Sequence, residues 1–294
     1  MNNSLSFQFT IINNSKIFEE DTFFIILTIL FTKIYGQDSI PVHKNVYNLN
    51  YKIEIPLTVG LFALNYYGFG QINQKSTLDT IQITSLNKND IWAFDRRAVE
   101  QSTSSYKQAQ KVSDWGAGIT VLAPALLLLD KDIRRNWLDV SLLYFETQAI
   151  NSNLYTWYGP VLHTRVRPFV YYEELPFYEK SESGTTDSFF SGHTSWTAGA
   201  SFFMAKVYSD FHPKLGGKKW WLFAAALFPP VFVGYHRYLG LKHFPTDIIV
   251  GTAIGAASGI LTPHIPKIKK NKKTTISISP YSRQYSGLAF RMKF

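Results

Sequence analysis

The sequence contains no cysteine among its 294 residues. This absence excludes a disulfide scaffold, a thiolate metal site and a cysteine nucleophile. Charged residues are also scarce, at 17%, and their signs are unbalanced, because 30 Lys and Arg against 21 Asp and Glu give a formal charge of +9. Apolar residues reach 46%, which is enough for a folded core and excludes a disordered chain.

Long apolar runs are missing as well, since no uncharged stretch clearly exceeds the ~18–20 residues of an unambiguous membrane span. Six shorter stretches recur, and each alone could be a buried helix of a soluble bundle. These stretches are Ile55–Ile72, Trp115–Leu129, Thr147–Leu162, Thr194–Ala205, Trp220–Tyr235 and Ile248–His264.

Two patterns favour a membrane bundle. Basic residues gather at alternate connections, as the positive-inside bias produces. Gly251, Gly255 and Gly259 form a smooth strip on which another helix can pack closely, as in membrane bundles, although a soluble bundle can use the same device. The basic residues are Lys131, Arg134 and Arg135, then Lys214, Lys218 and Lys219, then Lys267, Lys269, Lys270, Lys272 and Lys273.

The N-terminal region, residues 1–36, reads as a signal peptide or as an uncleaved membrane anchor. Its apolar run covers residues 23–32, but Glu19, Glu20 and Asp21 stand where positive charge is expected. The positions of the basic connections predict that Ile55–Ile72 begins on the cytoplasmic side of the membrane. Cleavage of a signal peptide would instead leave the new N-terminus outside the cytoplasm. Either the first segment is retained or one stretch does not cross.

The fold class that we expect is all-α, a transmembrane-type bundle of about six helices with a short C-terminal β-hairpin. Asp90–Val112 carries an apolar stripe and predicts an amphipathic helix. Alternating apolar residues predict a strand pair around Tyr281–Gly287. The expected parts are 37–112 (N-terminal helices and linker), 113–266 (catalytic bundle) and 267–294 (basic linker and hairpin).

Three short segments at the edges of apolar stretches carry the chemistry. In the first, Arg165 and Arg167 alternate before Pro168, and their guanidinium forks match phosphate oxygens. A basic patch that meets lipid headgroups is the alternative. In the second, Ser191, Gly192 and His193 open a helix, where free N–H groups bind anions; an ordinary capped helix with an incidental histidine is the alternative.

The third segment contains Arg237, His243 and Asp247. Pro245 favours a helix start, so Asp247 lies in the first turn, within reach of His243, where it can fix the imidazole tautomer. A carboxylate that only satisfies the helix dipole is the alternative. Together the three segments supply what phosphoryl transfer through a phosphohistidine needs: an oriented nucleophile, a second histidine for the leaving oxygen, and cationic donors.

These segments resemble the signature motifs of the type 2 phosphatidic acid phosphatase and vanadium haloperoxidase superfamily, over roughly residues 115–263. The motifs read Lys-x6-Arg-Pro, Pro-Ser-Gly-His and Ser-Arg-x5-His-x3-Asp. Arg167-Pro168, Ser191-Gly192-His193 and Arg237, His243 and Asp247 match in order and spacing. Three positions depart from the motifs: Pro160 replaces the Lys, Phe190 the Pro, and His236 the Ser.

The resemblance implies a metal-independent phosphatase without a cofactor. In it His243 attacks phosphorus, Asp247 orients His243, and His193 serves as acid and then base. Arg167, Arg237, Ser191 and the Gly192 amide hold the phosphate. Arg165 and His163 are the candidates to replace the missing Lys, and Arg165 is favoured because it alternates with Arg167. The expected substrate is a phosphorylated lipid or prenyl pyrophosphate, at a multi-pass inner-membrane site that faces the periplasm or exterior.

Three other functions stay open at this point. A soluble or peripheral periplasmic acid phosphatase would use the same residues, and the mean hydropathy of −0.07 suits it. A haloperoxidase is weakened by the missing Lys. A catalytically degenerate protein that binds phospholipid fits the departures at Pro160 and His236. Nucleic-acid binding is disfavoured, because the basic residues alternate with apolar helices and form no single stripe.

Overall fold

The computed structural model describes residues 46–271, 275–282 and 286–293. The chain divides after Lys44 into two units, and all described residues belong to the second. The predicted signal peptide or anchor, residues 1–36, therefore lies outside the described residues.

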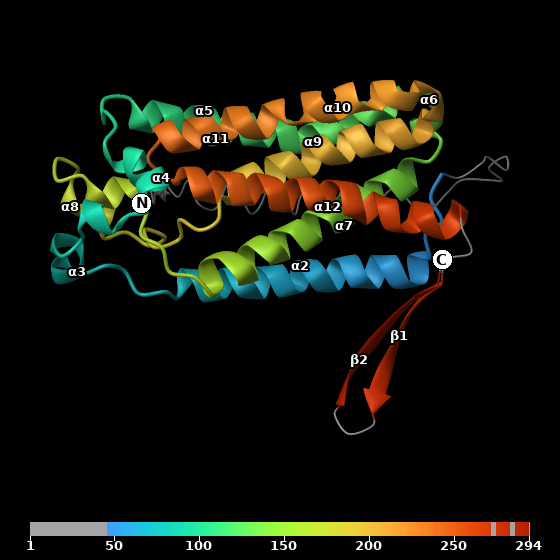
Figure 1. The fold of residues 1–294 in the computed structure, drawn as a ribbon, viewed down its shortest axis with the longest axis horizontal. Helices are drawn as coiled ribbons and strands as arrows, with labels where there is room; N and C mark the ends of the chain where they lie inside the picture. The colour runs from blue at the N-terminus through green and yellow to red at the C-terminus, as the bar shows by residue number, and fades with distance from the viewer. Residues whose placement is uncertain (1–45, 272–274, 283–285, 294) are drawn as a thin grey trace, which may run out of the picture. The chain divides into compact units, whose positions relative to one another are not determined.

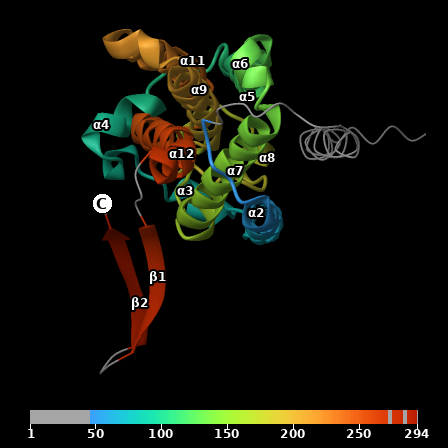
Figure 2. The same cartoon turned by 90° about the vertical axis from the view of Figure 1, so that its right-hand side faces the viewer.

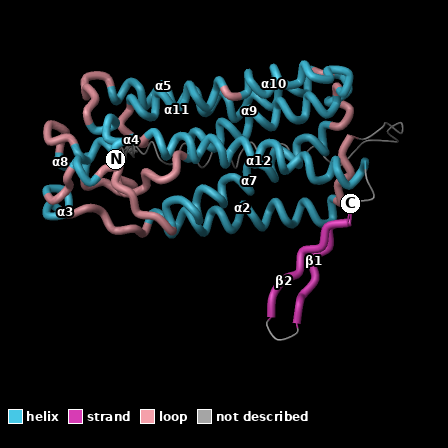
Figure 3. Tube along the Cα trace, in the orientation of Figure 1, coloured by secondary structure: helices cyan, strands magenta, loops and turns pink. Residues whose placement is uncertain are grey.

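Long helices run side by side through this unit (Figure 1). The six apolar stretches of the sequence lie in helical segments apart from Leu162 and Leu227. Figure 3 shows the helices in cyan. The longer helices are α2 (Tyr51–Asn73), α5 (Tyr106–Leu122), α7 (Trp137–Thr156), α9 (Gly192–Phe211), α10 (Lys219–Ala226), α11 (Phe228–Leu239) and α12 (Pro245–Asn271).

Short helical turns connect these helices, and two strands follow them. The turns are α3 (Thr80–Thr84), η1 (Lys88–Asp90), α4 (Ala93–Arg96), η2 (Arg97–Val99), η3 (Ala123–Leu129), α6 (Lys131–Arg134), η4 (Trp157–Val161), η5 (Pro168–Tyr171), α8 (Phe177–Lys180) and η6 (Pro213–Lys218). The strands β1 (Thr275–Ser282) and β2 (Ser286–Lys293) pair antiparallel, with Ile278 opposite Phe290.

The predicted amphipathic helix over Asp90–Val112 is wrong for residues 90–105. Residues 88–99 form separate short turns, and a continuous helix begins only at Tyr106. Ser102 accepts a hydrogen bond from the Ser104 amide at 3.3 Å, which is the local bonding by which serine competes with a helix. The predicted boundary between residues 112 and 113 falls inside α5.

The predicted single stretch Trp220–Tyr235 also differs from the structure. It is divided at Leu227, where α10 ends and α11 begins. Pro229 and Pro230 lie in the first turn of α11. Proline has no N–H and clashes with the preceding turn, so a regular helix cannot continue through this pair.

Helix α9 lies at the centre of the bundle and contacts α5, α7, α10, α11 and α12. Figure 2 shows α9 next to α5, α11 and α12. Its approach to α12 is very close. A Cβ added to Gly251, Gly255 or Gly259 would lie 2.0–2.5 Å from a backbone oxygen of α9 or its N-cap Ser191. The glycine strip predicted from the sequence is therefore confirmed as the surface where two backbones meet.

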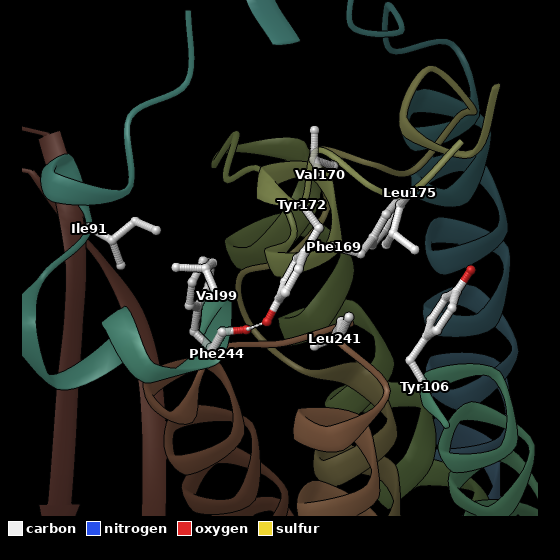
Figure 4. Close-up of a cluster of buried hydrophobic side chains, with 10 residues drawn as sticks. Ile91, Val99, Tyr106, Phe169, Val170, Tyr172, Leu175, Leu241 and Phe244 are labelled. Atoms are coloured by element: carbon white, nitrogen blue, oxygen red, sulfur yellow. Dashed lines mark hydrogen bonds between the residues drawn. The ribbon is translucent and has the colours of Figure 1, made fainter. Parts of the chain in front are cut away.

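Two apolar clusters fill the unit. One, at the end where α9 and α12 begin, contains Phe169, Leu241 and Phe244 together with residues of the 91–106 segment (Figure 4). In this cluster the Tyr172 hydroxyl donates to the Ala98 carbonyl at 3.2 Å. The other cluster includes Leu143, Phe203 and Val207. Two members of the first cluster, Leu241 and Phe244, are fully buried and lie two positions before and one position after His243 in the chain.

Replacing Gly255 by alanine should lower the melting temperature in detergent. The added Cβ would lie 2.0 Å from the Ser195 carbonyl oxygen, so α12 must move away from α9, at a cost of ~1–3 kcal/mol. Gly70→Ala is the matched control, since nothing lies within 4 Å of its Cβ position and alanine favours helix. An unchanged melting temperature for Gly255→Ala would contradict the close helix packing.

Candidate active site

All three sequence segments meet at one end of the bundle, where α11 ends and α9 and α12 begin. The Ser191 amide donates to the Asp247 carbonyl at 3.0 Å, which ties the starts of α9 and α12 together. The segment with Arg165 and Arg167 runs beside residues 184–188. The Arg165 amide donates to the Thr186 carbonyl at 2.9 Å, and the Arg167 amide donates to the Thr185 carbonyl at 2.8 Å.

His243 is almost fully buried, with 2% of its surface exposed. Its Nδ1 lies 2.7 Å from the Ser188 carbonyl oxygen. A carbonyl oxygen can only accept, so we assign the ring proton to Nδ1, which leaves the Nε2 lone pair available. This is the tautomer that a nucleophilic imidazole needs.

The charge state of His243 follows from the same surroundings. Burial lowers the pKa of His243 well below its usual range, and the nearby Arg167 and Arg237 guanidinium groups lower it further. The hydrogen bond to Ser188 opposes this effect without cancelling it. The imidazole is therefore neutral at pH 7 and keeps its lone pair.

Asp247 differs from the expectation in one contact. Its Oδ2 lies 3.9 Å from His243 Nδ1, which is farther than the Ser188 carbonyl. Oδ2 instead accepts from the Ser188 hydroxyl at 2.6 Å and from the Phe244 amide at 2.9 Å. The carboxylate thus fixes the two segments that hold the imidazole, and it acts on His243 through Ser188.

Arg165, which was expected to contact phosphate, forms ion pairs with two buried carboxylates. Nη1 donates to Asp247, and Nη2 donates to Asp95 at 2.7 Å. The guanidinium also lies over the Phe244 ring, 4.2 Å from its centroid. Because both terminal nitrogens are bound to these aspartates, the arrangement differs from a phosphate ligand and fits a residue that holds the 165–167 segment against α12.

Asp95 belongs to the stretch that was predicted as an amphipathic helix, and its role was not apparent from the sequence. It is buried, with 1% exposure, and accepts from the Thr246 amide at 3.0 Å as well as from Arg165. Its partners lie 70 and 151 positions away in the chain. Local sequence patterns do not reveal partners at such distances in the chain. The available signal for Asp95 was that it is a single acidic residue next to an apolar stripe.

His193 and Arg237 meet at a second carboxylate that the sequence did not single out. His193 Nε2 lies 3.1 Å from Asp114 Oδ1, and Arg237 Nη1 donates to the same oxygen at 3.0 Å. Asp114 is carried by α5, directly before the apolar stretch that starts at Trp115. An acid at the edge of a helix that could span a membrane was the signal that could have found it.

The remaining candidates line the same end. Arg167 Nε donates to the Gly184 carbonyl at 2.7 Å, which orients its guanidinium. The Ser191 hydroxyl caps α9 by accepting from the Thr194 amide at 3.4 Å. Gly192 allows the Tyr155 ring to approach, because a Cβ there would lie 3.0 Å from the ring. The positive ends of α9 and α12 both lie here, a favourable environment for an anion.

A lysine from another element contacts Pro160, the residue that replaces the motif lysine. Lys75, which follows α2, donates to the Pro160 carbonyl at 2.9 Å and pairs with Asp187 at 2.8 Å. This contact ties the end of α2 to the loop beside Arg165 and Arg167. In the described part of the chain, no group of three or more His, Asp or Glu side chains is arranged to hold a metal ion.

Comparison with known proteins identifies the region that carries these segments. The family model described as PAP2 superfamily matches residues 137–270, so the resemblance expected from the motifs is confirmed over this part of the chain. No curated protein matches the sequence significantly. The chain is also similar to a solved transmembrane PAP2 type phosphatidylglycerolphosphate phosphatase from Bacillus subtilis, with 20% identity, 76% of this chain and 99% of that chain covered, and a TM-score of 0.42.

We predict that the His243 imidazole stays neutral as the pH falls through 6.5. Its lowered pKa means that protonation, and the loss of the buried neutral form, occurs only at more acidic pH. Nitrogen NMR of histidine-labelled protein, with the signal assigned by its loss in His243→Gln, measures both the titration and the tautomer. A signal that titrates near 6.5, or one with the proton on Nε2, would contradict the assignment.

Proposed function

We propose that this PAP2-type protein is a membrane-bound phosphatase that hydrolyses a lipid phosphate or a polyprenyl or lipid pyrophosphate through a phosphohistidine on His243. One observation carries the proposal. A buried, neutral imidazole, with Nδ1 bound to the Ser188 carbonyl and Nε2 unprotonated, lies in the field of Arg167 and Arg237. This is the arrangement that in-line attack on phosphorus requires.

In the proposed first step, Nε2 of His243 forms a bond to phosphorus, and the bond from phosphorus to the leaving oxygen breaks. His193 gives its proton to that oxygen. In the second step His193 takes a proton from water, and the resulting hydroxide displaces His243 from phosphorus. Asp114, 3.1 Å from His193 Nε2, favours the protonated ring, whereas burial and the nearby Arg237 favour the neutral ring, so His193 takes up the proton that it gives together with the negatively charged substrate.

The cationic groups divide into two roles. Arg167 and Arg237, with Ser191 and the Gly192 amide at the start of α9, are proposed to hold the phosphoryl oxygens. Arg165 is proposed as a positioning residue, because Asp95 and Asp247 occupy its terminal nitrogens. Asp247 acts in the same way, since it holds Ser188, whose carbonyl fixes His243.

The outer surface of the bundle supports a membrane environment. Large apolar side chains are exposed along several helices, where a soluble protein rarely leaves extended apolar patches. On α5 and η3 they are Trp115, Ile119, Leu122, Leu126 and Leu129, and on α10 and α11 they are Trp220, Trp221, Leu227, Phe228, Val231, Phe232 and Tyr235.

Helix lengths also fit a bilayer. Two segments of the described chain, Tyr106–Leu129 and Pro245–Lys267, are long and apolar enough to cross a membrane. Helix α9 has 20 residues, which corresponds to ~30 Å, about the thickness of the hydrocarbon core.

The distribution of basic residues supports an orientation with the site outside the cytoplasm. The candidate site lies where α9 and α12 begin, whereas Lys131, Lys214 and Lys218 lie in the connections at the opposite end of the helices. Positive connections favour the cytoplasmic side, so we propose that the site faces the periplasm or exterior, at the level of the lipid headgroups.

His243→Ala should abolish phosphate release from phosphatidic acid or an isoprenyl pyrophosphate, with a loss of about 10⁴-fold or more, because no other group can carry the phosphoryl intermediate. Phosphate release by detergent-solubilised full-length protein measures the effect. His212→Ala, at the far end of α9, is the control and should keep the activity. Turnover retained in His243→Ala would refute the mechanism, and a phosphohistidine absent from quenched wild-type protein would favour lipid binding without turnover.

His193→Ala should slow hydrolysis of an alkyl phosphate more than hydrolysis of p-nitrophenyl phosphate. General-acid help is worth ~10²–10⁴-fold, and it matters little when the leaving group is stable without a proton. The ratio of the two rates in wild type and variant is the measurement. Equal losses on both substrates would assign His193 a role in binding instead of proton transfer.

A further inference from the structure

The connection between α11 and α12 carries a cation that the proposed mechanism does not use. Lys242 directly precedes His243. The connection turns sharply at Leu241, whose φ of 57° lies in the left-handed region, and the Lys242 amide donates to the Arg237 carbonyl at 3.1 Å. The turn therefore ties the backbone of Lys242 to Arg237.

The ammonium of Lys242 has an unusual environment for a lysine. It lies 5.0 Å from the centroid of the Phe169 ring. Within the described part of the chain, no carboxylate lies within ion-pair distance of it, whereas Arg165, Arg237 and Lys75 each pair with an aspartate. Its positive charge is thus not neutralised by direct contact with an acid.

The charged groups around Lys242 come from several elements. Arg167, before η5, and Arg237, on α11, repel its charge, while Asp114, on α5, and Glu182 partly offset this repulsion. Burial is the largest effect, and together these groups lower the pKa of Lys242 to about 7. Three cations are therefore held together at the site end of the bundle, in an arrangement that a bound anion would stabilise.

The three cations suit different parts of an anion. The planar forks of Arg167 and Arg237 can donate paired hydrogen bonds to phosphoryl oxygens, and Arg237 is already partly neutralised by Asp114. The ammonium group of Lys242 acts as a point charge, so it attracts a doubly charged anion more strongly than a singly charged one. With Lys242 protonated, the site balances two negative charges, as on a terminal phosphoryl group, better than the single charge of a phosphodiester.

We propose that Lys242 supplies a third cation to the phosphate site and selects ligands whose terminal tetrahedral group is doubly charged. The inference rests on the proposed function for the identity of the site, and it names the feature of the substrate that the site recognises. The site is expected to bind a lipid with a terminal phosphate more tightly than a phosphodiester lipid. Because Lys242 loses its proton as the pH rises through about 7 in the empty site, the selection is strong at pH 6 and weak at pH 9.

The test compares two tetrahedral anions of similar size, sulfate with two charges and methanesulfonate with one. Their charges do not change between pH 6 and pH 9. Binding to full-length protein in detergent is measured from the rise in melting temperature with anion concentration, at constant ionic strength. The variants are Lys242→Met, Lys242→Arg and, as a control for a lost surface charge, Lys111→Met on the exposed face of α5.

Wild type should prefer sulfate at pH 6, and the preference should fall about 10-fold in Lys242→Met, which corresponds to ~1.4 kcal/mol. Lys242→Arg should keep the preference at both pH values, whereas wild type should lose it by pH 9. Lys111→Met should behave as wild type. On a phosphomonoester substrate, Lys242→Met should raise KM much more than it lowers kcat.

A Lys242→Met variant that keeps the wild-type preference would overturn the inference, as would equal loss of both anions. Wild-type protein that binds neither anion at pH 6 would overturn it and would also count against the proposed function. A preference that depends on Lys242 in a protein that releases no phosphate from any lipid would sustain the inference and refute the proposed function. The two claims are therefore separable.

Discussion

The close contact between α9 and α12 is the constraint on which the candidate site depends. Gly255 and its two glycine neighbours on the strip let the α12 backbone lie against backbone oxygens of α9 and its N-cap. Because the two helix axes lie so close, the Ser191 amide donates a hydrogen bond to the Asp247 carbonyl. The N-termini of α9 and α12 therefore lie next to each other. His193 and His243, 50 positions apart in the chain, reach the same end of the bundle as a result.

Much of this arrangement could be predicted from the sequence, for physical reasons that are local. The glycine strip repeats every four residues, so it marks one helix face. Ser191 precedes an apolar run and caps it, and Pro245 begins a helix with Asp247 in its first turn. Each of these signals depends only on a residue and its near neighbours, and the motif spacing that suggested the superfamily has the same local character.

The sequence did not predict which side chains pair with one another in the candidate site. Asp95 and Asp114 look like ordinary acids in the sequence, yet one holds Arg165 and the other joins His193 to Arg237. The predicted contact between Asp247 and His243 differed because the Ser188 carbonyl, 55 positions away, lies closer to the ring. Arg165 was assigned to phosphate because it alternates with Arg167, and spacing alone does not reveal which arginine meets a carboxylate.

Asp95 and Asp114 also have a consequence for the bounds of the region that forms the candidate site. Both lie before residue 137, where the match to the PAP2 superfamily begins, yet each holds side chains inside that match. A fragment cut at the family boundary would remove Asp95 from Arg165, which would keep only Asp247, and would remove Asp114 from Arg237. A fragment that keeps both contacts therefore starts upstream of Asp95, and the residues of this stretch are constrained by partners far along the chain.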